Sequence, residues 1–296
     1  MGKRKTDHDP EDLPDASDSK DKQKDDDSDS EPDVDMVNVE FEWFDPQPAV
    51  DFHGLKTLLR QLLADDAHLF DLSALADLIL SQPLLGSTVK VDGNETDPYA
   101  FLTVINLETH KDKPVIQSLT SYFQKIASTT PSLSPLSTLL TTPPPSTQIG
   151  LLLTERLSNM PHATVPPMYT MLLEEITWAL EESEPYAFTH YLLLSKTYTL
   201  IESTLPTADQ PPSKKKKAAS ADKAEEVEYF HPEDQALHKH AVCWDHFKYQ
   251  TPPDAGKSDS RRVFQEMGIN PIGHLILIEA DKFKAAVQAL ETYLNG

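Results

Sequence analysis

Sequence patterns typical of β-strands and of α-helices alternate along this 296-residue chain, and the alternation limits the folds open to it. Helix patterns place apolar side chains three and four residues apart, whereas strand patterns alternate apolar with polar residues or form short apolar runs. Two strand patterns are neighbours, at 88–91 and 99–107, and Asp92, Gly93 and Asn94 between them favour a tight turn. One hairpin among alternating strands and helices predicts a single α/β domain, with a mixed sheet flanked by helices.

The other elements follow from the same patterns. Strands are predicted at residues 37–44, 149–153, 186–194, 227–230 and 273–278. Helices are predicted over 167–182 and 232–247, and directly after the capping residues Asp51, Asp71, Asp112 and Asp281. Residues 129–147 are rich in Ser, Thr and Pro, which predicts a loop. The order of elements resembles that of the GNAT-like fold, the fold of acetyl-coenzyme-A-dependent acetyltransferases.

Two charged segments fall outside these patterns. Residues 1–35 hold fourteen Asp or Glu and six Lys or Arg, with almost no apolar side chain. Residues 205–225 hold three prolines, a run of four lysines and several small residues. Neither segment can bury enough apolar surface to offset the entropy lost on ordering, so we expect both to be disordered. The folded domain is therefore expected within residues 36–296, interrupted by the Lys-rich insert at about 205–225.

The acids of the first segment are densest near its end, and we call them the acidic arm. They are Asp25, Asp26, Asp27, Asp29, Glu31, Asp33 and Asp35. The formal charge of the whole chain is −22. This charge disfavours nucleic acids and anionic membranes as direct ligands, because concentrated positive charge binds both. Basic proteins are the expected partners, and a solubilising tail without a partner is the alternative.

Cysteine and histidine give little sign of a metal site. Cys243 is the only cysteine, so an intramolecular disulfide cannot form and a Cys-based zinc site lacks ligands. On the predicted helix 232–247, His240, Cys243 and His246 share a face, which would permit metal binding. The alternative is an amphipathic helix with histidines at the edge of its buried face, and we favour it. We therefore predict no metal site.

The sequence also lacks the motifs of common enzyme classes. Glycines never stand in Gly-x-Gly spacing, and Gly268 and Gly273 are followed by His274 where a phosphate-binding loop requires Lys. Acetyltransferases bind the pyrophosphate of the cofactor on backbone N–H groups at the start of a helix. Glycines in that turn let the cofactor come close to the backbone. The join at 107–114 has no glycine, and its Pro114 lacks an N–H group. We predict no enzymatic activity, no catalytic residue and no cofactor.

Several short segments are candidate transport or modification signals. Lys214, Lys215, Lys216 and Lys217 resemble a nuclear import signal, and Lys3, Arg4 and Lys5 are a weaker second candidate. Leu72, Leu75, Leu78 and Leu80 have the spacing of an export signal, but any amphipathic helix has that spacing too, and a core helix is favoured. Ser28 and Ser30 are each followed three residues later by an acid, a pattern typical of acid-directed phosphorylation sites.

The composition fits a protein of the nucleus that shuttles to the cytoplasm. No apolar segment near residue 1 is typical of a secretory signal, and no apolar run reaches the roughly 18 residues of a membrane span. The single cysteine fits a reducing compartment. A nuclear import receptor is the partner that the lysine run predicts.

Several motifs together resemble the BCCIP family, in its fungal Bcp branch. They are the segment 37–45 after the acidic arm, His53, Gly54, Leu55 and Lys56, the segment 86–90, the segment 97–101, and Asn270 and Pro271 ahead of the strand 273–278. The resemblance covers nearly the whole chain. The entry from strand to helix and the Asp97, Pro98, Tyr99 turn are its most specific parts.

The resemblance implies a nuclear protein with an acetyltransferase-like fold and no such activity. Family members chaperone a basic ribosomal protein of the large subunit and support assembly of that subunit. Fungal members are also linked to the nuclear export of a phosphatidylinositol phosphate kinase. We therefore expect a non-enzymatic escort of a basic ribosomal protein. The alternatives are an export adaptor for the lipid kinase and, less favoured, an acetyltransferase.

Overall fold

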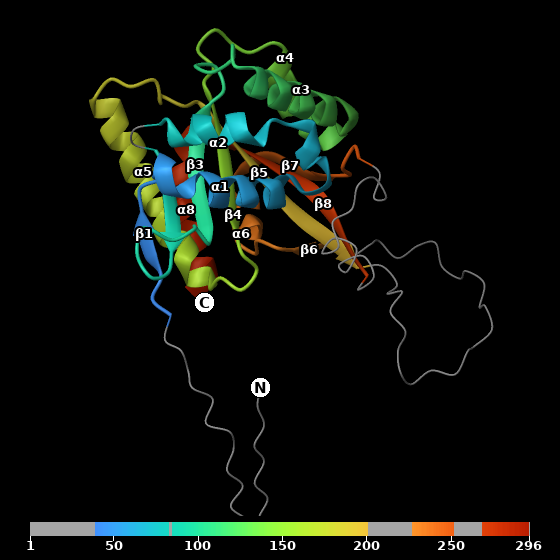
Figure 1. Ribbon diagram of the computed structural model, residues 1–296. Coiled ribbons are helices and arrows are strands. Elements are labelled where there is room, and N and C mark those ends of the chain that lie inside the picture. The colour runs from blue at the N-terminus through green and yellow to red at the C-terminus, as the bar shows by residue number, and fades with distance from the viewer. Residues whose placement is uncertain (1–38, 83–84, 201–226, 252–267, 296) are drawn as a thin grey trace, which may run out of the picture. The chain divides into compact units, whose positions relative to one another are not determined.

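A mixed sheet runs through the middle of the molecule (Figure 1). The computed structural model describes residues 39–82, 85–200, 227–251 and 268–295. Among them the sheet has eight strands, and seven follow the order β1-β2-β3-β4-β5-β8-β7 while β6 pairs with β5. The strands are β1 (Glu42–Phe44), β2 (Ser87–Lys90), β3 (Ala100–Asn106), β4 (Ile149–Arg156), β5 (His190–Leu200), β6 (Val227–Tyr229), β7 (Ala241–Phe247) and β8 (Ile269–Glu279).

Only one pair of neighbouring strands in this described sheet is parallel. β4 and β5 pair in parallel from Ile149 opposite His190 to Leu153 opposite Leu194. Beyond Leu153 the two strands diverge, and β6 pairs with β5 at Thr197, Tyr198 and Thr199 instead. Since β8 already pairs with the same stretch of β5 on its other side, β6 lies on the side that β4 has left.

Helices cover both faces of the sheet. They are α1 (Pro48–Leu63), α2 (Leu72–Leu80), α3 (Pro114–Thr129), α4 (Ser134–Thr141), α5 (Val165–Glu181), α6 (Asp234–His238) and α8 (Ala280–Asn295). The first four pack on one face, and α5, α6 and α8 pack on the other. Short 3-10 helices, η1 (Ala64–Leu69), η2 (Pro131–Leu133) and η3 (His162–Thr164), join or precede them.

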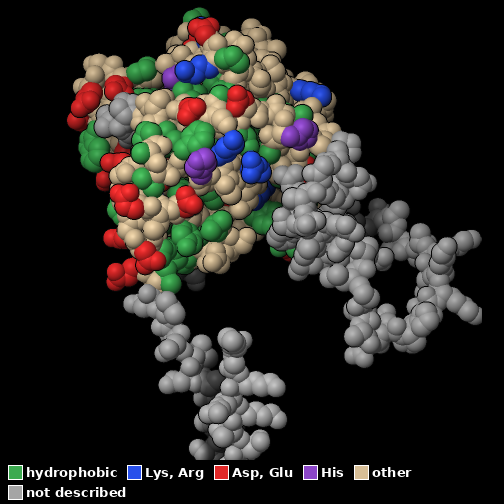
Figure 2. Space-filling model, in the orientation of Figure 1, with side chains coloured by type: hydrophobic (Ala, Val, Ile, Leu, Met, Phe, Trp, Pro, Cys, Tyr) green, Lys and Arg blue, Asp and Glu red, His purple; other side chains and the backbone are tan. Residues whose placement is uncertain are grey.

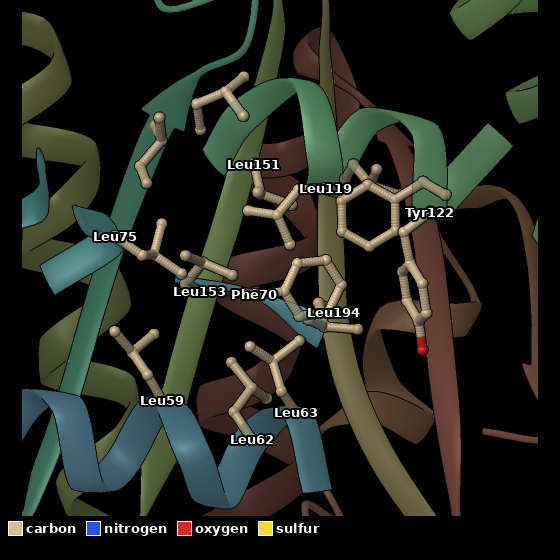
Figure 3. Close-up of a cluster of buried hydrophobic side chains, with 14 of the residues drawn as sticks. Leu59, Leu62, Leu63, Phe70, Leu75, Leu119, Tyr122, Leu151, Leu153 and Leu194 are labelled. Carbon is tan, nitrogen blue, oxygen red and sulfur yellow. The ribbon is translucent and has the colours of Figure 1, made fainter. Parts of the chain in front are cut away.

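Alternation along the central strands divides the buried side chains between the two faces. Leu151 and Leu153 of β4 point toward α1, α2 and α3, as Figure 3 shows. Leu152 between them points to the opposite face, where Tyr169 of α5 and Phe283 of α8 are buried. Each fully buried side chain of this size contributes roughly 1.5–3 kcal/mol, so the sheet core dominates the stability. The predicted single α/β domain with a mixed sheet flanked by helices is confirmed. The GNAT-like topology stays a prediction.

Three of the four predicted helix caps are wrong. Asp281 lies inside the first turn of α8, which starts at Ala280, so it is not the N-cap of that helix. Asp71 caps α2 as expected, accepting the N–H groups of Ser73 and Ala74 at 3.1 and 3.0 Å. α1, however, starts at Pro48, and Asp51 in its first turn is fully buried against Lys90 at 2.6 Å. Lys113 occupies the N-cap position of α3 without a side-chain bond, so Asp112 is not its cap.

Two segments have a different secondary structure from the one predicted. Residues 129–147 contain α4 in place of a loop, because Leu133 and Leu136 are buried against the sheet face and Pro135 is tolerated in the first turn. The predicted helix 232–247 ends at His238, and β7 follows it. In β7 the buried Cys243 and Phe247 alternate with the exposed Val242 and Trp244, a period of two.

Other predicted elements are confirmed with shifted ends, and the two charged segments remain untested. β5 starts at His190, later than the predicted residue 186, and extends past residue 194 to Leu200. β8 starts at Ile269, before the predicted residue 273. Residues 1–38 and 201–226 lie outside the described residues. The expected disorder of 1–35 and 205–225 is therefore still a prediction.

We predict that Gly273→Ala destabilises the domain by about 1–3 kcal/mol, because overpacking forces a buried neighbour to move. Gly273 lies opposite Phe247, and a Cβ atom there would overlap the buried phenyl ring. The ring centroids of Tyr122 and Tyr249 lie 6.0 and 5.9 Å from the centroid of the Phe247 ring, and the two tyrosines restrict its movement. Urea unfolding measures the change. In a Phe247→Leu background, Gly273→Ala should lower the free energy of unfolding by less, because the phenyl ring is absent. Equal losses in the wild-type and Phe247→Leu backgrounds would contradict this explanation.

Candidate functional site

A concavity lies where β4 and β5 diverge. It has a volume of about 660 Å³. One wall comes from α1 and η1, a second from the end of β4 and the loop after it, and a third from β5, β6 and β8. Aromatic side chains of Tyr198, Tyr229 and Phe230 line it together with a group of buried charges. We call this concavity the seam pocket.

Two ion pairs are buried at the inner end of the seam pocket. Arg156, at the end of β4, binds Glu233 with its two terminal guanidinium nitrogens. One of these contacts, Nη2 to Oε2, measures 2.9 Å. Lys196 of β5 lies 2.5 Å from Oε2 of Glu155. All four side chains are at most 8% exposed. Burying such charges is favourable only when each has an opposite partner, as each of these does.

His231 connects the two ion pairs. Its Nε2 lies 3.3 Å from Glu155 and its Nδ1 lies 3.6 Å from Glu233. Burial alone would lower the pKa of His231, but the two carboxylates outweigh it and raise the pKa to about 9. Burial would likewise raise the pKa of Glu155, but Lys196 and His231 outweigh it and lower the pKa to about 2. At neutral pH the imidazole is therefore a cation shared by two carboxylates.

Gln61 of α1 closes the seam between the diverging strands. Its side-chain amide donates to the backbone carbonyl oxygen of Arg156 at 2.9 Å. The backbone carbonyl oxygen of Gln61 accepts from the ammonium group of Lys196 at 3.2 Å. The N–H of Arg156 donates to Glu155 at 2.9 Å. Both backbone polar groups of Arg156 thus already have partners within the chain. The seam pocket therefore holds a stabilising network, in which Glu155 and Glu233 each face cationic partners.

The segment that leads from β4 into the helical connection to its parallel neighbour β5 also lacks the features of a cofactor-binding turn. The sequence placed that join at 107–114, but this segment leads through α3 and α4 to β4, which is antiparallel to β3. The join into the crossover is 157–164, between β4 and α5. It contains no glycine, and Pro161 together with Pro166 and Pro167 in the first turn of α5 removes N–H donors.

The candidate metal ligands do not converge. Because β7 is a strand, Cys243 points into the core while His246 points to the opposite face, beside His274. Burial raises the pKa of the Cys243 thiol. In the part of the chain that the structure describes, no three His, Cys, Asp or Glu side chains are arranged to hold a metal ion.

A polar chain that the sequence did not indicate lies on that opposite face. Asp234 accepts from Ser195 at 2.6 Å and lies 3.1 Å from Nδ1 of His274. The Nε2 atoms of His274 and His238 are 3.0 Å apart. Burial, followed by the charge of His274, lowers the pKa of both His238 and His246 to about 4. These residues come from four separate elements, so no local sequence pattern brings them together.

The predicted transport signals have different outcomes. Leu72, Leu75, Leu78 and Leu80 are all buried in the core, as the core-helix alternative predicts. The import candidates Lys3, Arg4, Lys5 and Lys214, Lys215, Lys216, Lys217 lie outside the described residues, as does the acidic arm. None of the described helices is long and apolar enough to cross a membrane.

We predict that the free energy of unfolding falls by about 2–3 kcal/mol as the pH rises from 6.5 to 9, through loss of the His231 proton. The folded pKa lies above the unfolded one, so this stabilisation is complete below about pH 6.5 and is lost as the pH passes about 9. Urea titrations at several pH values measure it. His231→Gln should be less stable but should lack this part of the pH dependence. Equal slopes for both proteins would contradict the prediction.

Comparison with known proteins identifies the family. The BCCIP family model matches residues 36–237. The protein bcp1 of Aspergillus fumigatus is 60% identical over 261 residues, covering 88% of this chain and 89% of that protein. The protein bcp1 of Schizosaccharomyces pombe is 53% identical, covering 86% and 90%. The crystal structure of BCP1 from Saccharomyces cerevisiae is 26% identical with a TM-score of 0.60, covering 90% of this chain and 93% of that one. The chain therefore belongs to the BCCIP family.

Proposed function

We propose that this protein is a non-enzymatic nuclear chaperone that binds a basic ribosomal protein of the large subunit and escorts it to the site of assembly. The observation that carries the proposal is the formal charge of −22, with 48 acidic against 26 basic residues. Such a charge attracts basic proteins and repels nucleic acid, so it keeps a ribosomal protein from binding RNA prematurely. Membership of the BCCIP family supports the same role.

The acidic arm and the folded domain have separate tasks in this proposal. Charge interactions that are screened by salt are individually weak, so a dense run of acids raises the rate of encounter more than the final affinity. Specificity requires a shaped, partly apolar surface, which residues 39–296 can provide. The domain therefore selects the client, and the acidic arm captures it.

The geometry of the seam pocket disfavours the acetyltransferase alternative. Gln61, Glu155 and Lys196 already bind the backbone and the charges at the point where the strands diverge. A calorimetric titration with acetyl-coenzyme A tests this alternative, and we expect no heat of binding. For an adaptor of a phosphatidylinositol phosphate kinase, the described residues provide no specific support, because the export-like leucines are buried.

Retention of ribosomal proteins tests the proposed function. The full-length protein is immobilised and incubated with the acid-extracted proteins of purified large subunits at about 0.15 M salt, where the Debye length is about 8 Å. We expect one or very few of these proteins to be retained in stoichiometric amounts. Retention of all basic proteins in proportion to their charge would reduce the role to non-specific neutralisation, and no retention would refute it.

We predict that deleting residues 1–35 slows client association and lowers its dependence on salt, yet leaves a stable complex. The deletion removes fourteen acids and six bases, so it changes the long-range field and spares the folded surface. Association kinetics at low and moderate salt measure the first effect, and co-purification of the client measures the second. Loss of the complex on truncation would make the acidic arm the principal binding element.

We predict that Lys214, Lys215, Lys216 and Lys217 direct nuclear import. Replacing all four by Ala removes the positive charges that an acidic receptor groove reads, so a fluorescent fusion should move toward the cytoplasm. Replacing Lys3, Arg4 and Lys5 alone should have a smaller effect. A fusion that stays nuclear after both sets are replaced would contradict import by either segment.

A further inference from the structure

Trp178 is an exposed aromatic side chain on a helix whose other apolar residues are mostly buried. It lies near the end of α5 and is 56% exposed, the largest exposed fraction of the three tryptophans that the chain contains. An indole exposed to water forgoes the favourable free energy of burial, which it regains when a partner covers it. An exposed Trp is therefore a typical anchor of a binding surface.

Acidic side chains surround Trp178 on the same helical face. Glu174 lies four residues before it, and Glu181 and Glu182 lie three and four residues after it, so all three are its neighbours on the helix surface. All three are exposed. The sequence has no Lys or Arg between Arg156 and Lys196, so no nearby base in the sequence compensates them.

The position of these acids is unfavourable for the isolated helix. The C-terminal end of a helix carries a partial negative charge and favours Lys, Arg or His. The last turn of α5 has no basic residue, and Glu181 and the C-cap residue Glu182 are acids. A local arrangement that costs stability without any gain within the chain is the kind that function explains. A cation placed there would stabilise both the carboxylates and the helix end.

Asp45, directly after β1, adds a further acid beside α5. At the opposite end of α5 from Trp178, Trp43 of β1 donates from its indole N–H to the carbonyl oxygen of Thr164 at 3.4 Å. Burial raises the pKa of Glu175, and the negative charges of Asp45 and Glu174 raise it further, so Asp45 lies within electrostatic range of α5. In Figure 2 red acidic side chains line the edge where Figure 1 places α5 and β1.

We infer that the exposed face of α5 formed by Glu174, Trp178, Glu181 and Glu182 binds an arginine-rich segment of the basic client. A guanidinium group can stack on the indole face while its N–H groups donate to the flanking carboxylates. Lysine fits less well, because its ammonium group cannot stack and donate in a fork at the same time. This inference rests on the proposed function for the identity of the client, and it names the surface that selects it.

Paired substitutions in the full-length protein test the inference, with the ribosomal protein retained by the wild type as the probe. Trp178→Leu keeps an apolar side chain but removes the aromatic face, and we expect about tenfold weaker binding. Trp178→Tyr keeps an aromatic face and should bind within about threefold of the wild type. Equal affinity of the Leu variant and the wild type would overturn the inference.

Charge reversal has a matched control elsewhere on the surface. Glu181→Lys with Glu182→Lys should weaken binding about tenfold or more, since it repels a cationic segment. Glu95→Lys with Glu291→Lys makes the same change of net charge at two other exposed positions and should weaken binding only about twofold. Equal losses in the two variants would overturn the inference, because the client would then respond to net charge alone.

The thermal stability of the same variants separates a binding role from a structural one. Bases in the last turn of α5 complement the helix dipole, so the Glu181, Glu182 reversal should raise the melting temperature by about 2 °C while binding weakens. A structural role would lower both. A lowered melting temperature together with weaker binding would overturn the inference.

A second probe keeps the test independent of the proposed function. If the wild type retains no ribosomal protein, the proposed function fails, and fluorescein-labelled nona-arginine replaces the client at about 0.15 M salt. The same order of affinities among the four variants is then expected, with nona-lysine bound more weakly than nona-arginine. Indistinguishable affinities for all variants would refute the arginine-binding face.

Discussion

The early end of the parallel pairing between β4 and β5 is the constraint on which the rest of the structure depends. Five residue pairs join the strands, and then the strands separate and leave backbone and side-chain polar groups in the middle of the sheet. Buried polar groups without partners cost several kcal/mol each, so the seam must be filled. β6, the amide of Gln61 and the two ion pairs linked by His231 fill it. Three cations against two carboxylates leave no anion in this cluster without a partner.

Filling the seam from within the chain determines where function can reside. An open seam between diverging strands is where a sheet of this kind has room for a ligand. Here Arg156 and Lys196 bind the carboxylates of Glu233 and Glu155, and the side-chain amide of Gln61 binds the backbone. The crossover helix starts with prolines rather than with free N–H donors. These paired groups thus stabilise the seam. The outer surface, whose excess of acids follows from the composition, is the better match for the proposed basic client.

The sequence predicted those helices whose apolar pattern is long, even where the predicted cap was wrong. α2, α3, α5 and α8 show apolar residues at helical spacing, and Asp71 caps α2 as predicted. β7 was missed because His238 to Phe247 satisfies helical spacing as well as alternation, and only pairing with β8 decides between them. The seam network could not be predicted. Arg156 and Glu233 are 77 residues apart, and nothing local in the sequence indicates that they meet. The same holds for Asp51 and Lys90, since a buried aspartate near a helix start has the sequence signature of a cap.

The proposed escort would have to bind its client firmly in transit and release it at the site of assembly, and the distribution of charge suits both needs. Exposed carboxylates bind through interactions that ribosomal RNA can replace with a denser array of phosphates, so the client has a favourable route from protein to RNA. A single aromatic anchor adds specificity without the large buried area that would make release slow. A rigid sheet whose buried charges are paired holds such an anchor at a fixed position, whereas an acidic tail alone would bind any basic protein. In the proposed function, the stability of the interior and the acidity of the surface act together, because the first fixes the geometry with which the second discriminates.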